Sequence, residues 1–336
     1  MKRILIYLLL GSCLAACATP HLQRTSSIAQ ASRLTPDRII MDDGYELPLA
    51  IWQPEAEPRA IVLALHGFND YRNAFADIAP TLTAAGIQLY AYDQRGFGET
   101  AERGIWPGSE RLQQDAAAAS ELLCRKYPDL PLFIIGESMG GAVAMVMLEN
   151  ASSSCVDGVV LVAPAVWGWR SMPLWQQSAL WLAAHTWPDR KLTGEGLDIM
   201  ASDNIEMLRA QGRNPLVIKE TRIDTMYGLT TLMESALLSS SQLNIPALIL
   251  YGERDEIIPV DPLCEMLSTL PVQRPANWRL VLYPEGYHML TRDLQAEVVL
   301  DDIVAWLKDR KAGLPSNLEV AAETQGIQAL CNHLLQ

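Results

Sequence analysis

A serine between glycines is the residue best suited to do chemistry in this chain. Ser138 lies in the middle of Gly136-Glu137-Ser138-Met139-Gly140, after an apolar run and before a helical pattern. This is the G-x-S-x-G arrangement, in which the nucleophile occupies a strained turn and larger flanking side chains would collide with neighbouring backbone. The following helix directs its N-terminal N–H groups to where negative charge develops. We therefore predict Ser138 as a nucleophile; the alternative is an ordinary N-cap serine.

A serine hydroxyl is a poor nucleophile and needs a base within hydrogen-bond reach. The chain contains five histidines: His21, His66, His185, His288 and His333. His288 stands in Gly286-Tyr287-His288, after the last strand candidate and just before the final long helical pattern. With a nucleophile of this kind the base comes from that later loop. We predict His288 as the base, the alternative being a histidine on a surface loop.

The acid that orients the base should lie between these two residues in the sequence, at the end of a strand. Asp255 does so, in Tyr251-Gly252-Glu253-Arg254-Asp255 after an apolar run. Glu253 is the rival, but a base on a neighbouring loop favours the longer loop reach of Asp255. Asp261, which precedes a proline, is more typical of a helix N-cap. We predict Asp255 as the orienting acid.

Two backbone N–H groups should bind the negatively charged oxygen that forms during attack on a carbonyl. One belongs to the residue after the nucleophile, Met139, and the other to a loop after an early strand. His66-Gly67-Phe68 ends such a strand, so we predict Phe68 N–H as the second donor. No His/Glu or Cys/His cluster has metal-ligand spacing, and we expect neither a metal nor an organic cofactor.

Alternating strand and helix patterns must position these residues. Most strand candidates are short, near-continuous apolar runs that end in Gly or Pro, as in a parallel sheet buried on both faces. They span residues 38–41, 47–52, 60–65, 87–92, 132–135, 159–162, 247–251 and 279–283. Helical patterns span residues 71–85, 109–127, 139–149, 262–270 and 294–310. The chain is therefore predicted as an α/β protein with a mostly parallel, doubly wound sheet.

Residues 165–242 interrupt this alternation with several helical patterns and no clear strand. We predict a helical cap over the carboxyl edge of the sheet, where ligands bind in open α/β sheets. The cap holds five of the nine tryptophans: Trp167, Trp169, Trp175, Trp181 and Trp187. We favour the cap's own core for most of them, and an apolar acyl pocket or a membrane-facing edge as the functional alternative. A core without the cap should keep some hydrolysis of short esters.

The first residues have the pattern of an export signal. Lys2 and Arg3 precede an apolar run over residues 4–10, too short to span ~30 Å of hydrocarbon. Leu14-Ala15-Ala16-Cys17 then resembles the lipobox of bacterial lipoproteins, which implies cleavage after residue 16 and a lipid on Cys17; the alternative is a plain secretory signal. Ala18 at the next position favours the outer membrane, facing the periplasm. Residues 17–37 are predicted as a polar tether, whose flexible part would span ~25 Å.

Export would expose the remaining cysteines to an oxidising compartment. Cys124, Cys155, Cys264 and Cys331 allow three pairings, among which the sequence does not choose, and four buried thiols are an equal alternative. The composition is that of a globular protein, with 49% hydrophobic and 19% charged residues over 336 positions. A formal net charge of -13 argues against nucleic acid as a partner, because phosphate binding needs clustered Lys and Arg.

Several motifs together resemble the monoglyceride lipase and lysophospholipase group of α/β-hydrolases. They are His66-Gly67-Phe68-Asn69-Asp70, Tyr92-Asp93-Gln94-Arg95-Gly96-Phe97-Gly98, the serine motif extended by Gly141, and the acid and base loops described above. The resemblance covers about residues 39–307 and implies the α/β-hydrolase fold, with a core of residues 38–164 and 243–310. Residues 311–336 form a tail outside the usual pattern. At Glu137 many members carry His, whereas some plant members, among them esterases of phenolic esters, carry Glu.

The resemblance implies a lipid-anchored serine ester hydrolase acting on monoacylglycerol or lysophospholipid through an acyl-enzyme. Its partners would be a lipid or small ester substrate and, through Cys17, a membrane of the cell envelope. An acyltransferase, a phenolic-ester esterase or a peptidase would use the same three residues, and these alternatives stay open. A non-catalytic envelope lipoprotein is disfavoured because Ser138, Asp255 and His288 occur together in the order typical of this fold.

Overall fold

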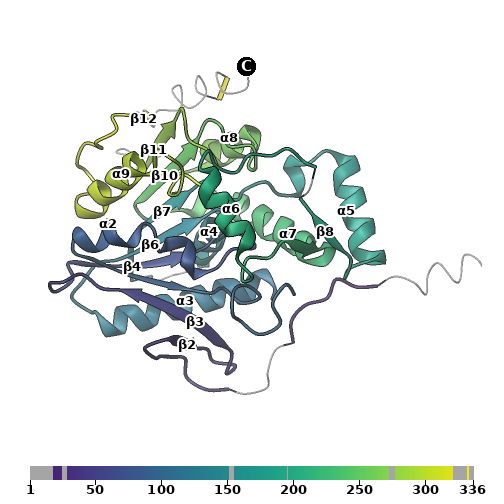
Figure 1. Ribbon diagram of the computed structural model, residues 1–336, viewed down its shortest axis with the longest axis horizontal. Coiled ribbons are helices and arrows are strands. Elements are labelled where there is room, and N and C mark those ends of the chain that lie inside the picture. Colours follow the sequence, from purple (N-terminus) through teal and green to yellow (C-terminus); the bar gives the residue numbers. More distant parts are fainter. Residues whose placement is uncertain are drawn as a thin grey trace, which may run out of the picture.

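The computed structural model describes residues 18–24, 29–150, 155–194, 196–271, 277–320 and 331–332. Its centre is a ten-stranded sheet in the order β1-β2-β3-β5-β4-β6-β7-β10-β11-β12 (Figure 1). The strands from β5 to β11 in this order are parallel, and those outside them are antiparallel. Their bounds are β1 Arg33–Leu34, β2 Arg38–Ile40, β3 Glu46–Trp52, β4 Ala60–Leu65, β5 Ile87–Tyr92, β6 Leu132–Glu137, β7 Val156–Val162, β10 Ala247–Gly252, β11 Trp278–Tyr283 and β12 Glu319–Val320. The predicted α/β-hydrolase architecture is confirmed.

The parallel strands are apolar on both faces because helices cover both faces. Every residue of β4, β5, β6 and β10 is buried. Along β4, Ile61 and Leu63 join one core cluster, while Val62 and Ala64 join the other. The first cluster lies under α3 (Ser109–Lys126), α4 (Met139–Asn150), α7 (Ile223–Ser239) and α8 (Val260–Thr269), and the second under α2 (Ala79–Ala84) and α9 (Ala296–Lys308).

One predicted helix is broken. Residues 71–85 form a short 3₁₀ helix, η1 (Arg72–Phe75), and a separate α2. Pro80 lies in the first turn of α2, where its missing N–H does no harm, whereas a continuous helix would place it in the interior and clash with the preceding turn. The prediction of one helix over residues 71–85 is therefore wrong about continuity.

The segments predicted as tether and tail contribute to the folded domain. Gln23 is buried, with its backbone N–H bonded to Trp106 O and its amide bonded to Glu102 O and Ile105 O. Within the predicted tether of residues 17–37, β1 also pairs with β2. In the tail, β12 extends the sheet beyond β11. Parts of both polar stretches are therefore hydrogen-bonded to the domain.

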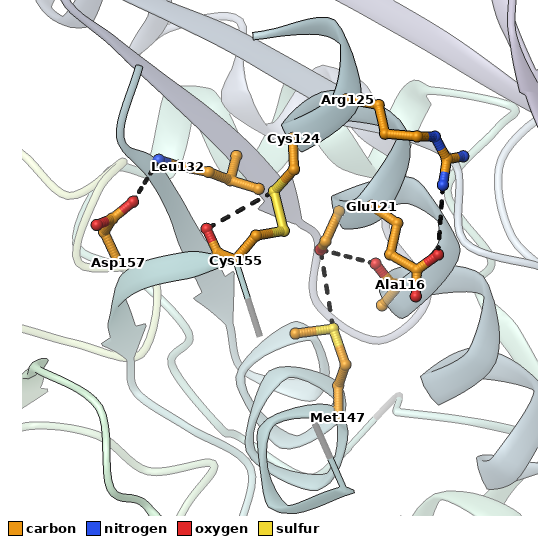
Figure 2. The surroundings of a disulfide bond; sticks show 9 residues. Ala116, Glu121, Cys124, Arg125, Leu132, Met147, Cys155 and Asp157 are labelled. Atoms are coloured by element: carbon orange, nitrogen blue, oxygen red, sulfur yellow. Dashed lines mark hydrogen bonds and ion pairs between the residues drawn. A yellow bond between two sulfur atoms is a disulfide. The ribbon is translucent and has the colours of Figure 1, made fainter. Parts of the chain in front are cut away.

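Two disulfides join the described cysteines. Cys124 at the end of α3 is bonded to Cys155, just before β7, beside a bond from Leu132 N–H to Asp157 (Figure 2). Cys264 on α8 is bonded to Cys331 in the tail. Of the three pairings that the sequence left open, the structure therefore takes this one.

The cap follows β7 and ends before β10. It contains η2 (Trp169–Ser171), α5 (Leu174–Thr186), α6 (Ile205–Arg213), α7 and η3 (Ser240–Gln242). It also contains an antiparallel pair that the sequence did not indicate, β8 (Lys191–Thr193) with β9 (Glu220–Arg222). These strands have three residues each, too few for an alternating pattern to stand out. None of the helices in the described ranges is long and apolar enough to cross a membrane.

Candidate active site

Ser138 lies on a strained turn between β6 and α4. Its φ is 52°, in the left-handed region that costs energy for a residue with a side chain. The turn is held by its backbone N–H on Val162 O (2.9 Å) and by Ala165 N–H on its own carbonyl (3.0 Å). A Cβ on Gly136 would lie 2.6 Å from Gly140 O. The predicted steric reason for the flanking glycines therefore holds in the structure.

Asp255 and His288 are brought together from the loops after β10 and β11. His288 Nδ1 lies 2.7 Å from Asp255 Oδ2, and both side chains are buried. The other oxygen of Asp255 accepts hydrogen bonds from the N–H groups of Ile257 (2.8 Å) and Ile258 (2.9 Å). The rival Glu253 is exposed. Within the described segments, the Ser138 hydroxyl and His288 do not form a hydrogen bond with each other.

The loop after β4 is organised by a neutral histidine. Burial lowers the pKa of His66, and the ring donates from Nδ1 to Gly67 O (2.8 Å) while Nε2 accepts from Gln94 N–H (2.9 Å). The Gln94 amide returns a bond to His66 O (2.7 Å). These hydrogen bonds fix the backbone just before Phe68, whose N–H is one of the two predicted oxyanion donors.

The backbone N–H groups of Phe68 and Met139 both adjoin Ser138. Met139 follows it in the chain, and a Cβ built on Gly67, next to Phe68, would lie 3.4 Å from the Ser138 Cβ. Neither N–H donates to another group in the described part of the chain. The two predicted oxyanion donors therefore lie on the segments next to Ser138.

The cap holds the loop that carries His288. Met289 N–H donates to Ala201 O (3.0 Å), and the Ser202 hydroxyl donates to Asp293. Asn204 donates from Nδ2 to Arg292 O (3.0 Å). Burial raises the pKa of Asp293, although its bonds to Ser202 and to Tyr287 N–H oppose this shift. The cap therefore helps to hold the loop that carries His288.

Three of the cap tryptophans face outward. Trp175, Trp181 and Trp187 are 69%, 51% and 62% exposed, so the expectation that most cap tryptophans form an internal core is wrong for these. Trp169 and Trp181 line an open cleft of about 670 Å³. Its other lining residues are Gln177, Ser178, Leu182 and Tyr227. Ser138, Asp255 and His288 are not among the residues that line this cleft.

The predicted signal peptide, residues 1–16, and the predicted lipidation site, Cys17, lie outside the described residues. Among the described residues, no group of three or more His, Cys, Asp or Glu side chains is placed to hold a metal ion.

The fold and these residues define a serine hydrolase with the α/β-hydrolase fold. The family described as serine aminopeptidase, S33, matches residues 56–295, and the chain belongs to it. A monoacylglycerol lipase of Mycolicibacterium smegmatis is 25% identical over 79% of this chain and 93% of its own length. A caffeoylshikimate esterase of Arabidopsis thaliana is 26% identical over 76% of this chain and 80% of its own length. A crystal structure of a Paleococcus ferrophilus monoacylglycerol lipase shares the fold, with a TM-score of 0.65, 22% identity, and coverage of 78% of this chain and 98% of that one.

Proposed function

We propose that this protein is a serine ester hydrolase in which Ser138, Asp255 and His288 act together. The Ser138 oxygen attacks the ester carbonyl while His288 takes its proton, and the N–H groups of Phe68 and Met139 bind the oxyanion. His288 then returns the proton to the departing alcohol, which leaves an acyl-enzyme. Water, deprotonated by His288, hydrolyses this intermediate.

The bond between His288 Nδ1 and Asp255 is the observation that carries this proposal. It leaves Nε2 as the ring nitrogen available to the nucleophile, because Asp255 holds the proton on Nδ1. The alternative, a histidine on a surface loop, does not explain why His288 is buried against a carboxylate whose second oxygen accepts from two backbone N–H groups. The arrangement therefore supports a base and its orienting acid.

For the substrate we propose an ester of a single acyl chain, with monoacylglycerol or lysophospholipid as the class. The apolar cleft on the cap can accept methylene groups, whose burial is worth ~0.8 kcal/mol each. A monoacylglycerol lipase and a monoglyceride lipase among the relatives, which match 79% and 84% of this chain, support the same substrate class.

A second candidate is an ester of a phenolic acid. Glu137 departs from the His that many lipase members carry, and the similar plant protein is a caffeoylshikimate esterase. The flat rings of Trp169, Trp181 and Tyr227 could stack on a phenolic ring as well as pack along an acyl chain.

A panel of esters with purified protein distinguishes these candidates. It contains monoacylglycerols and lysophospholipids of increasing chain length, short esters, a phenolic ester and an aminoacyl amide. We expect kcat/KM to rise with acyl length, and Trp181→Ala to remove this rise. Trp187→Ala is the matched control, because Trp187 is exposed but does not line the cleft. A preference for the phenolic ester or the amide would overturn the lipid proposal while leaving the hydrolase intact.

We further propose that the mature protein is a lipoprotein of the cell envelope, anchored through Cys17 to the outer membrane and facing the periplasm. The Leu14–Cys17 string supports the anchor, and the two disulfides are typical of an oxidising compartment. Mass spectrometry of the N-terminal peptide from membranes should find a lipid-modified Cys17, and Cys17→Ser should release the protein in soluble form. An unmodified cysteine or a different mature start would refute this.

A further inference from the structure

A single buried arginine connects the separate loops of the site. Arg292 follows His288 by four residues on the same loop, and its guanidinium makes two ion pairs. Nη2 lies 2.9 Å from Glu137 Oε1, next to Ser138 in the chain, and Nη1 lies 2.8 Å from Asp70 Oδ2. All three side chains are almost fully buried.

Asp70 extends this connection to the oxyanion loop and to the cap. It lies two residues after Phe68, and its Oδ1 accepts from Tyr71 N–H (2.9 Å). Its Oδ2 also accepts from Gln211 Nε2 (2.8 Å), which belongs to α6 of the cap. One guanidinium thus joins the base loop, the nucleophile turn and the oxyanion loop, and through Gln211 the cap.

The sheet alone does not set the distance between nucleophile and base. Ser138 follows β6 and His288 follows β11, and β7 and β10 lie between these strands. The loop that carries His288 must therefore cross two strands to reach Ser138. The ion pair between Arg292 and Glu137 spans this crossing directly, at the residue before the nucleophile.

The guanidinium stays charged in this position. Burial alone would lower the pKa of Arg292, but the carboxylates of Glu137 and Asp70 outweigh burial and raise it above its ordinary value. A charge buried with fixed partners resists displacement, since moving it away would leave unpaired carboxylates in a dry environment. The guanidinium of Arg292 is therefore suited to hold the loops of the site in fixed positions relative to one another.

We propose that Arg292 is a positioning residue, which through Glu137 and Asp70 sets the placement of His288 and of the Phe68 N–H relative to Ser138. The inference rests on the proposed roles of Ser138, His288 and Phe68. It also accounts for Glu137: a histidine at this position would remove one carboxylate from the guanidinium and add a second basic group. Glu137 and Arg292 form a matched pair in this chain.

The alternative is that the two ion pairs only stabilise the fold, and the chain offers a matched control for it. Arg95 is also buried and also bridges two carboxylates, with Nε 2.8 Å from Asp115 and Nη1 2.8 Å from Asp43. None of its partners lies on the loops that carry Ser138, Asp255 or His288. Lysine at either position keeps the positive charge but lacks the planar guanidinium that bonds two carboxylates at once.

The experiment compares Arg292→Lys, Glu137→Gln and Arg95→Lys in steady-state kinetics on a short soluble ester, together with thermal unfolding. We expect Arg292→Lys and Glu137→Gln to lower kcat about 10- to 100-fold with KM changed less than about threefold, because a displacement of about 1 Å costs about this much. Arg95→Lys should lower the unfolding midpoint with kcat within twofold of the wild type. The double variant Arg292→Lys, Glu137→Gln should lose less kcat than the product of the two single-variant factors, because both substitutions break the same ion pair.

The outcomes separate the positioning role from the proposed function. If kcat in Arg292→Lys stays within twofold, or falls only in step with the unfolding midpoint as in Arg95→Lys, the positioning role is refuted. If the wild type hydrolyses no ester, the substrate proposal fails, and the rate at which a fluorophosphonate labels Ser138 replaces kcat. That rate must then fall in Arg292→Lys and not in Arg95→Lys. If the labelling rate falls in neither variant, the inference is overturned.

Discussion

At the scale of single residues, the carboxylate of Asp255 is held on both of its oxygens. One accepts from His288, and the other accepts from two backbone N–H groups of its own turn. The imidazole therefore meets an acceptor whose position does not depend on substrate. In the proposed mechanism, this fixed acceptor would select one tautomer of His288 and stabilise the imidazolium that forms during turnover.

Replacing Asp255 by Asn should lower kcat by at least about 100-fold and up to about 10,000-fold, because an amide can present an N–H to Nδ1 and favour the wrong tautomer. Glu253→Gln is the control, since Glu253 is exposed on the same loop and should have activity within twofold of the wild type. Steady-state kinetics on a short ester measures both. Equal losses in the two variants would show that the loop, and not the carboxylate of Asp255, matters.

The residues of the site were predictable from sequence where they follow a local pattern. Ser138, Asp255 and His288 each stand at a strand end within a short motif, and the structure places Asp255 on His288. Arg292 was not predicted, because its partners Asp70 and Glu137 are 222 and 155 residues away in the chain. No local pattern indicates such a pair, although the unusual Glu137 was visible.

At the scale of elements, the cap and the core depend on each other. The segment before α6 bonds to the base loop through Ala201, Ser202 and Asn204, and α6 bonds to Asp70. The sequence predicted the cap as an insertion with its own role, because its helical patterns break the alternation of the core. It could not show these bonds, which join residues about 90 positions apart.

Deleting residues 165–241 and closing the gap with a short linker should abolish turnover of short esters as well as long ones. The base loop would lose its bonds to Ala201, Ser202 and Asn204, so His288 would no longer be held. This differs from the independence of the core expected from sequence. Kinetics on a short ester, with circular dichroism to establish folding, tests it, and substantial activity in a folded deletion variant would contradict the coupling.

The disulfide between Cys124 and Cys155 closes a loop with a sequence separation of 31 residues and fixes the end of α3 beside β7. Replacing both cysteines by serine should lower the free energy of unfolding by about 3 kcal/mol, chiefly by releasing the unfolded chain. Chemical denaturation of the double variant measures this, and a change below about 1 kcal/mol would contradict it. Activity below the unfolding transition should stay near that of the wild type, because neither cysteine adjoins the site.

At the scale of the whole molecule, the N-terminal segment is bound to the side of the domain that carries the cap. Gln23 is anchored on the loop before α3, and His21 N–H donates to Asp224 on α7 (3.2 Å). Asp224 N–H in turn donates to Pro188 O, next to the exposed Trp187. With a lipid on Cys17, four residues before His21, the cap would be held within about 14 Å of the anchor. Such an attachment would be shorter than the ~25 Å expected for a flexible tether.

A fluorophosphonate probe tests whether Ser138 is the nucleophile of an ester hydrolase. The probe reacts only with a serine that a base activates, and peptide mass spectrometry then identifies the modified residue. We predict one modified serine, Ser138, with loss of ester hydrolysis in proportion to labelling, and no labelling or turnover in Ser138→Ala. Labelling at another serine, or turnover retained in Ser138→Ala, would contradict the account.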